Sequence, residues 1–260
     1  MTTALGPSHF TRAKSGERQL AARVQPCAVA RSHVGTVRSR NEDRWLARPD
    51  VGLWAVADGM GGHQSGELAS GLLVEALERV TLRSSGHALL NAAMNEIRFV
   101  NSELRARAQE IAPGAVIGST IVALVVFDGH CAVVWAGDSR AYRLRCGHLE
   151  IMTSDHRVVQ ELIDQGQLTP AEAARHPRAN VVTRAVGGGE RLDLDTRYEA
   201  VEDGDVFLLA SDGLTDVVRD EEIAELLVAG TMDQAADELL ALSLSRGARD
   251  NITFVLVTPM

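Results

Sequence analysis

Two aspartates, each followed by a glycine, stand where this chain could do chemistry. Asp58 comes directly after the apolar run 52–57, and Asp212 comes after the run 206–210. Short apolar runs bounded by turn residues are typical of strands. A strand that ends in Asp-Gly places a carboxylate at a sheet edge, where glycine lets the backbone turn and approach a ligand. Two such carboxylates at one edge repel each other unless a cation lies between them.

Other aspartate–glycine pairs have a simpler explanation. The pair at Asp128 lies between the apolar runs 120–127 and 131–136, which predicts a hairpin turn. The pair at Asp203 predicts a turn before a strand, and any single pair is most often only a turn. The metal hypothesis therefore depends on how many acidic residues lie at the margins of apolar runs. These are Glu42 with Asp43, Asp58, Asp138, Asp212 with Asp216, and Asp250.

The type of these side chains indicates the type of cation. Carboxylate oxygens without cysteine or paired histidine favour Mg²⁺ or Mn²⁺ over zinc. Two such ions that share a bridging carboxylate can hold a hydroxide and clamp a phosphate. The acidic residues therefore predict a metal site built on oxygen ligands.

Strands in groups and helices in pairs are expected around these residues. The predicted strands are 28–37, 44–47, 52–57, 118–127, 131–136, 140–146, 149–152, 194–200, 205–210 and 252–258. The predicted helices are 67–80, 90–111, 158–165, a short one that starts at Thr169-Pro170, 221–228 and 232–246. Short turns between strands favour antiparallel sheets with helices on their outer faces, in an α+β domain, over a doubly wound parallel sheet.

Composition limits the class of protein. With 260 residues, 45% of them hydrophobic, the chain can bury one full core, and one domain is expected over 27–260. Residues 1–26 are predicted to be a poorly ordered N-terminal extension. A net charge of -9 argues against nucleic acid or an anionic membrane as partner, and no apolar run is long enough to span a membrane. Three cysteines without metal-type spacing favour a reduced compartment, so we expect a cytoplasmic protein.

Five segments together resemble the metal-dependent protein phosphatase family (PPM, type 2C), in that family's order and spacing. The resemblance runs from about Ala28 to the C-terminus. It implies a four-layer αββα fold, that is, a β-sandwich of two antiparallel sheets flanked by pairs of helices, with a two-metal centre at one edge. The segments are Arg38-x-x-Asn-Glu-Asp43, Val-Ala-Asp58-Gly-Met-Gly-Gly-His63, Gly137-Asp-Ser-Arg140, Ala-Ser-Asp212-Gly-Leu-Thr-Asp216 and Arg249-Asp-Asn251.

The resemblance also implies which residues bind two Mn²⁺ or Mg²⁺ ions. Asp58 would bridge both ions, and the carbonyl of Gly59 would complete one site. Asp212 and Asp250 would complete the other site. The residues expected beside them, acting partly through metal-bound waters, are Glu42, Asp43 and Asn251. The residues at the position where some family members bind a third, weaker metal are Asp138 and Asp216.

The activity implied is direct hydrolysis of phosphoserine and phosphothreonine on proteins, by a water that bridges the metals. Arg38 would hold the phosphate with its planar fork; the alternative is a solvated surface arginine, which is less expected four residues before Glu42. His63 is the candidate general acid, unless it only forms local hydrogen bonds in its glycine loop. His176 and Asn180 lie in a segment, about 156–190, that resembles the family's flap, and they would shape substrate access.

Several positions depart from the family's pattern. His33 stands where an aspartate is more frequent, and Ser119 replaces a frequent threonine. Arg157 follows Asp155-His156 where a serine is common. None of these departures removes an expected metal ligand, and those in the flap concern substrate preference and the third metal.

Alternative functions can be weighed against the same residues. A cysteine-dependent phosphatase is excluded, because it needs Cys-x5-Arg and the cysteines lead to His33, Gly137 and Met152 at that spacing. A non-catalytic phosphatase-like binding or regulatory module would show loss of a core aspartate, and all are present. The expected partners are phosphorylated proteins, namely a bacterial Ser/Thr kinase or its targets, and the chain is expected to be a monomer. The motif forms resemble the secretion-associated branch of the family.

Overall fold

Two antiparallel sheets stack face to face in the computed structural model, which describes residues 27–61 and 65–259. The first sheet has the strand order β1 (Cys27–His33), β11 (Ile252–Thr258), β10 (Val206–Ala210), β7 (Arg140–Arg145) and β8 (His148–Ile151). The second has the order β2 (Asp43–Arg48), β3 (Leu53–Met60), β5 (Ile121–Phe127), β6 (His130–Ala136) and β9 (Asp195–Ala200), and β4 (Gly118–Ser119) pairs with the end of β3.

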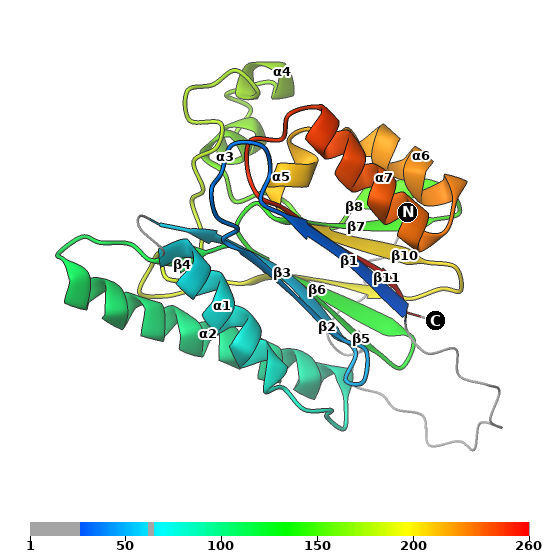
Figure 1. The fold of residues 1–260 in the computed structure, drawn as a ribbon. Helices are drawn as coiled ribbons and strands as arrows, with labels where there is room; N and C mark the ends of the chain where they lie inside the picture. The colour runs from blue at the N-terminus through cyan, green and yellow to red at the C-terminus, as the bar shows by residue number, and fades with distance from the viewer. Residues whose placement is uncertain (1–26, 62–64, 260) are drawn as a thin grey trace.

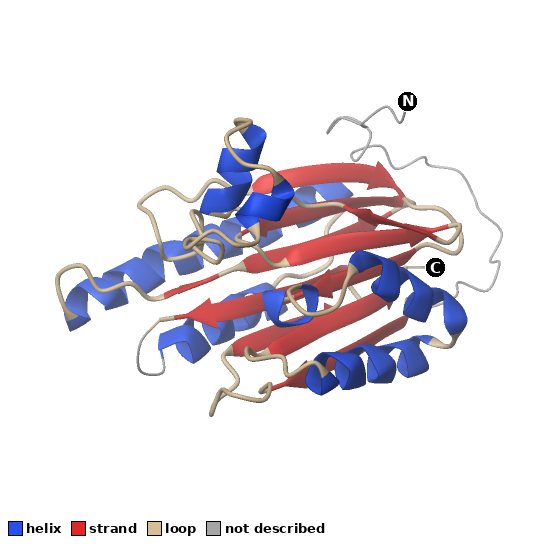
Figure 2. Ribbon diagram, turned by 90° about the horizontal axis from the view of Figure 1, so that it is seen from above, coloured by secondary structure: helices blue, strands red, loops and turns tan. Residues whose placement is uncertain are grey.

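Helices form the two outer layers (Figure 1). The second sheet is covered by α1 (Ser65–Glu78) and α2 (Gly86–Ile111). The first sheet is covered by α5 (Asp212–Thr215), α6 (Asp220–Ala229) and α7 (Met232–Ser245). Two short helices, α3 (Val158–Asp164) and α4 (Pro170–Ala173), lie in the connection between β8 and β9. Figure 2 shows the strands running alongside one another between the helices. The predicted αββα sandwich is therefore confirmed.

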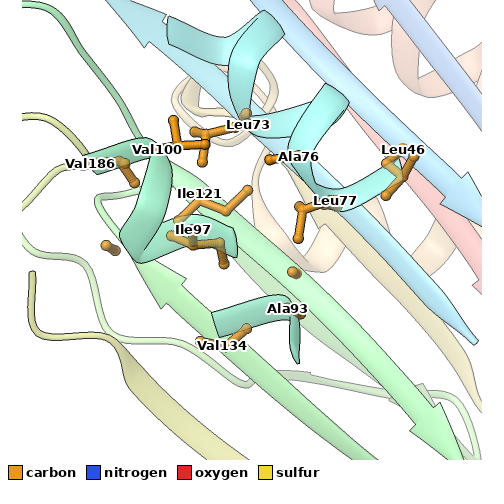
Figure 3. Packing of buried hydrophobic residues seen from close by; sticks show 14 of the residues in the cluster. Leu46, Leu73, Ala76, Leu77, Ala93, Ile97, Val100, Ile121, Val134 and Val186 are labelled. Carbon is orange, nitrogen blue, oxygen red and sulfur yellow. The ribbon is translucent and has the colours of Figure 1, made fainter. Parts of the chain in front are cut away.

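Three apolar cores hold the four layers together. Leu73 and Leu77 of α1 pack with Ile97 and Val100 of α2 against the second sheet, as Figure 3 shows. A second core lies between the sheets, and it contains Trp54, Val122, Trp135, Phe207, Leu209 and Val255. The third core joins the first sheet to α5, α6 and α7. Each sheet is thus buried on both faces by elements far apart in the chain.

The central strand β5 is apolar throughout and shows no polar alternation, because both of its faces are buried. Ile121 and Val125 face the helix-covered core, whereas Val122 and Leu124 face the core between the sheets. Successive strand residues point to opposite faces, so a strand with two buried faces must be apolar throughout. The unbroken apolar run that the sequence shows at this position is the consequence.

Some element boundaries differ from those that the sequence predicts. The strand expected to stop at Asp58 continues to Met60, because β4 pairs with Gly59 and Met60. The first strand ends at His33, four residues early. The hairpin predicted at Asp128 is confirmed, with positive φ angles at that residue and the glycine after it. The N-terminal extension 1–26 and His63 lie outside the described residues.

No helix among the described residues is long and apolar enough to cross a membrane.

The layered packing predicts a graded response to substitution. Leu209 is fully buried between the sheets, whereas Thr231 caps α7 by accepting a hydrogen bond from the Gln234 N–H. We expect Leu209→Ala to lower the free energy of unfolding by about 2 to 5 kcal/mol, and Thr231→Ala to lower it by about 1 kcal/mol. Urea unfolding followed by circular dichroism measures both. Equal losses in the two variants would contradict the assignment of Leu209 to a close-packed core.

Candidate metal centre and active site

A cleft of about 720 Å³ opens at the edge of the sandwich where several strands begin or end. Asp58 lies near the end of β3, Asp212 lies two residues after the end of β10, and Asp250 lies two residues before the start of β11. Antiparallel pairing of β10 and β11 brings Asp212 and Asp250 to one side of the first sheet, and stacking of the second sheet places Asp58 in the same cleft, although the residues are far apart in the sequence. The predicted site residues that line the cleft are Arg38, Glu42, Asp58, Gly59, Asp138, Asn180, Asp212, Asp250 and Asn251.

Three predicted residues stand apart from that lining. Asp43 is buried, and it lies directly opposite Asp58 in the register of β2 and β3. Asp216 ends α5, where it forms an ion pair described below. His176 is half-buried in the flap, where its Nδ1 accepts a hydrogen bond from the N–H of Arg178. Of the two flap residues, the structure therefore brings only Asn180 to the cleft.

The glycines after Asp58 and Asp212 permit close packing of backbone against backbone. A Cβ on Gly59 would lie 2.1 Å from the carbonyl oxygen of Gly66, and a Cβ on Gly213 would lie 1.9 Å from that of Asn251. Neither glycine has a positive φ angle. Their role is therefore close approach and not the turn that the sequence suggested.

Burial raises the pKa values of the carboxyls at this edge. It raises the pKa of Asp43 to about 6 and, with the charges of Asp138 and Asp216, that of Asp212 to about 8. Burial, followed by the charges of Asp43 and Asp212, raises the pKa of Asp58 well above its ordinary value. These groups can all be ionised at neutral pH only if cations compensate their charge.

Two buried carboxylate oxygens at this edge have no hydrogen-bond partner among the described residues. They are the buried Oδ1 atoms of Asp43 and Asp212. A buried unpaired acceptor is costly, and a cation removes that cost. Among the described residues, no group of three or more His, Cys, Asp or Glu side chains is arranged to hold a metal ion by itself. The unpaired oxygens and the all-oxygen donor set nevertheless fit Mg²⁺ or Mn²⁺, which take backbone carbonyls and waters as further ligands.

Arg38 and Asp250 form an ion pair at the mouth of the cleft. Arg38 donates from Nε and Nη2 to the two carboxylate oxygens of Asp250, at 3.0 and 2.7 Å. Their side chains are 58% and 42% exposed, and exposed pairs of this kind contribute little free energy. A metal at Asp250 and a phosphate at Arg38 can therefore replace this pair at small cost.

Asn251 organises the loop that carries Arg38 and Glu42. Its Nδ2 donates to the carbonyl oxygens of Val34 and Arg40 at 2.9 and 2.8 Å, and its Oδ1 accepts from the Glu42 N–H at 2.7 Å. Both N–H groups of this amide side chain and one of the two lone pairs on its oxygen are thus in use. Asn251 acts here through the backbone of its neighbours.

Sequence reasoning missed two hydroxyl residues that support the aspartates. The Ser211 hydroxyl donates to Oδ2 of Asp43 at 2.9 Å, which leaves only Oδ1 unpaired. Thr120 Oγ1 accepts from the Asp58 N–H at 3.1 Å, and the Thr120 N–H donates to the Asp58 carbonyl at 2.8 Å. Serine and threonine are common beside strands, so Thr120 gave no signal in the sequence. The only signal for Ser211 was its position directly before Asp212.

Arg157 is the other residue whose place the sequence did not reveal. Its guanidinium donates to carboxylate oxygens of Asp138, Asp212 and Asp216. It stands at the base of the flap, where it forms a β-bridge with Val182. The only signal in the sequence was the departure from serine at this position.

Comparison with known proteins agrees with this geometry. The sequence pattern described as protein phosphatase 2C matches residues 31–248. The chain belongs to the protein phosphatase 2C family. Family membership supports a protein phosphatase function.

Named relatives of this phosphatase 2C chain are bacterial. It is 40% identical over 228 residues to the serine/threonine protein phosphatase PstP of Mycobacterium tuberculosis, covering 88% of this chain and 44% of that protein. The chain thus spans less than half the length of this curated relative. It also resembles the solved structure of PppA, described as a key regulatory component of the type VI secretion system (T6SS) in Pseudomonas aeruginosa. That match has a TM-score of 0.83 and 43% identity, and it covers 89% of this chain and 96% of PppA.

One solved relative contains metal. The catalytic domain of PstP, in complex with two manganese ions, matches with a TM-score of 0.79 and 37% identity, covering 89% of this chain and 97% of that one.

Close packing at Gly59 gives a test with a matched control. We expect Gly59→Ala to destabilise the protein and to reduce metal binding, because the added Cβ collides with the Gly66 carbonyl. Gly71 lies within α1, and nothing lies within 4 Å of a Cβ placed there. Gly71→Ala should therefore stabilise by about 0.5 to 1 kcal/mol, through helix propensity. Thermal unfolding and Mn²⁺ titration measure both; a harmless Gly59→Ala would contradict the close approach.

Proposed function

We propose that this chain is a metal-dependent protein phosphatase that hydrolyses phosphoserine and phosphothreonine. The observation that carries the proposal is the edge of the sandwich where buried carboxylates with unpaired oxygens lie beside Arg38. Such an edge attracts divalent cations, and cations beside a guanidinium attract the phosphate of a substrate. Membership of the phosphatase 2C family supports the same conclusion.

The metal ions would be held by oxygen ligands at this edge. Two Mn²⁺ or Mg²⁺ ions, when bound, would supply an acidified water as nucleophile and would neutralise phosphate charge. The residues proposed to hold them are Asp58, the Gly59 carbonyl, Asp212 and Asp250, with Glu42, Asp43 and Asn251 around them. Ser211 keeps Oδ2 of Asp43 engaged, so that Oδ1 is the oxygen left to accept from a water or to bind a cation.

Arg38 is proposed to bind the phosphate. Its guanidinium already forms a two-pronged contact with a carboxylate, and phosphate oxygens accept the same geometry. Asn180 lines the cleft from the flap side, where it can contact the peptide around the phosphorylated residue. His63 stays the candidate proton donor to the departing oxygen on sequence grounds alone.

The substrates are proposed to be proteins phosphorylated by a bacterial Ser/Thr kinase, or the kinase itself. PppA, similar to this chain at 43% identity, is described as a regulator of type VI secretion. This likeness and the motif forms favour a secretion-linked target over a general signalling one. A monomer in the cytoplasm remains the expected state.

Metal-dependent turnover is the first test. We expect hydrolysis of p-nitrophenyl phosphate and of a phosphothreonine peptide with Mn²⁺ or Mg²⁺ and none with EDTA. Asp212→Asn should lower kcat/KM at least about a hundredfold, because the amide cannot neutralise a cation. The matched control is Asp205→Asn. Asp205 is also a buried aspartate, but it pairs with Arg145 at the end of β7 that lies away from the cleft. Asp205→Asn should keep turnover within about threefold.

Two outcomes separate the proposal from the binding-module alternative. A folded, metal-loaded wild type without turnover would overturn the phosphatase assignment and favour a regulatory module. Equal losses in Asp212→Asn and Asp205→Asn would mean that the loss reflects folding and not the site.

Substitution of Arg38 tests phosphate binding. We expect Arg38→Ala to raise KM for the phosphopeptide about ten- to a hundredfold, since a charge-assisted hydrogen bond contributes about 1.5 to 3 kcal/mol. Arg31, which pairs with Asp233 and Asp237 away from the cleft, provides the control. Steady-state kinetics of Arg38→Ala and Arg31→Ala should differ in KM. An unchanged KM in Arg38→Ala would show that Arg38 does not contact the phosphate.

A further inference from the structure

Arg157 places one guanidinium among three carboxylates at the metal edge. Its Nε lies 2.6 Å from Oδ2 of Asp138, its Nη2 lies 3.2 Å from Oδ2 of Asp212, and its Nη1 lies 3.3 Å from Oδ1 of Asp216. All three nitrogens of the fork are thus engaged. Charge-assisted hydrogen bonds of this kind are the strong ones.

Arg157 and Asp138 form the part of this cluster that is closed to water, whereas Asp212 and Asp216 are 19% and 37% exposed. The Arg157 side chain is 9% exposed, and that of Asp138 is 4% exposed. A buried arginine needs its partners, because an uncompensated buried charge is strongly destabilising. The next carboxylate, that of Asp155, lies 3.9 Å from Nε and already pairs with Arg140.

A divalent cation bound by Asp138 and Asp216 would need the same space. A Mg²⁺ ion, for example, lies about 2.0 to 2.1 Å from each oxygen that binds it. One oxygen of each aspartate already contacts a guanidinium nitrogen, so an ion held by both would lie against the positive charge of Arg157. The residues here therefore do not fit a third metal while Arg157 is in place.

Arg157 leaves the proposed two-metal centre accessible. Oδ2 of Asp212 accepts a hydrogen bond from Arg157. The other oxygen, Oδ1, is buried and has no hydrogen-bond partner among the described residues. One carboxylate can therefore serve the guanidinium with one oxygen and a metal with the other. The single positive charge of Arg157 also leaves net negative charge among the aspartates, which a divalent ion can neutralise.

We propose that Arg157 is a built-in cation that takes the place of a third metal, so that this chain binds two divalent ions and not three. The inference rests on the proposed two-metal phosphatase centre. It assigns Asp138 and Asp216 to an ion-pair cluster, in place of the third-metal role that the family resemblance suggested.

The same contact fixes the flap to the metal edge. Residues on either side of Arg157 are hydrogen-bonded to the returning strand of the flap, with the Val158 N–H donating to Val181 at 3.0 Å and the Thr183 N–H donating to His156 at 2.7 Å. The side chain of Arg157 then ties this base to the strand ends that carry Asp138 and Asp212. Arg157 is thus a positioning residue, and flap attachment does not require an ion.

Metal stoichiometry tests the proposal without measuring activity. Mn²⁺ would be titrated into the full chain, with free Mn²⁺ followed by electron paramagnetic resonance and bound metal by mass spectrometry after equilibrium dialysis. We expect two bound ions in the wild type and in Arg157→Lys, and three in Arg157→Ser. Adding Asp216→Asn to Arg157→Ser should return the number to two, because the third site then loses a ligand.

Arg145→Ser is the matched control. Arg145 also pairs with a buried aspartate, Asp205, but at the opposite end of β7, so its loss should leave two ions bound. A wild type that binds three ions, or a folded Arg157→Ser that binds only two, would overturn the role of Arg157. A wild type that binds no Mn²⁺ would instead overturn the two-metal centre itself, and this inference with it.

Discussion

The mutual repulsion of carboxylates at one edge of the sandwich is the constraint on which the rest of this structure depends. Asp43, Asp58, Asp138, Asp212 and Asp250 come from five separate strands or strand ends and meet within one cleft or directly behind it. Burial of these groups is unfavourable in the absence of positive charge. The three apolar cores supply the free energy that holds the strand ends together despite this repulsion.

Positive charge reaches this edge in two physically different forms. Arg38 is exposed and its pair with Asp250 is easily exchanged, which suits a residue that must release a carboxylate and take a phosphate. Arg157 is buried and contacts three carboxylates, which suits a permanent part of the fold. The buried Oδ1 atoms of Asp43 and Asp212 have no hydrogen-bond partner among the described residues, and metal ions are proposed to bind there.

The fold was largely predictable because its local signals agree with one another. Apolar runs predicted the buried strands, 3.6-residue periodicity predicted α1 and α2, and the box at Thr231 predicted the start of α7. The end of β3 was predicted wrongly, because glycine after Asp58 signals a turn by local rules. The glycine at position 59 is instead required by the close approach of the Gly66 carbonyl, and the local sequence does not reveal this contact.

The sequence by itself determined the order of the elements, the acidic residues at strand margins and the all-oxygen character of the site, since these depend on residue type and local spacing. Tertiary structure alone decided which charges face each other. The partners of Arg157 lie 19, 55 and 59 residues away, so no local pattern could reveal that a flap arginine contacts three aspartates. Likewise, only packing decided that Ser211 leaves one oxygen of Asp43 unpaired, because hydrogen-bond geometry exists only once the strands have assembled.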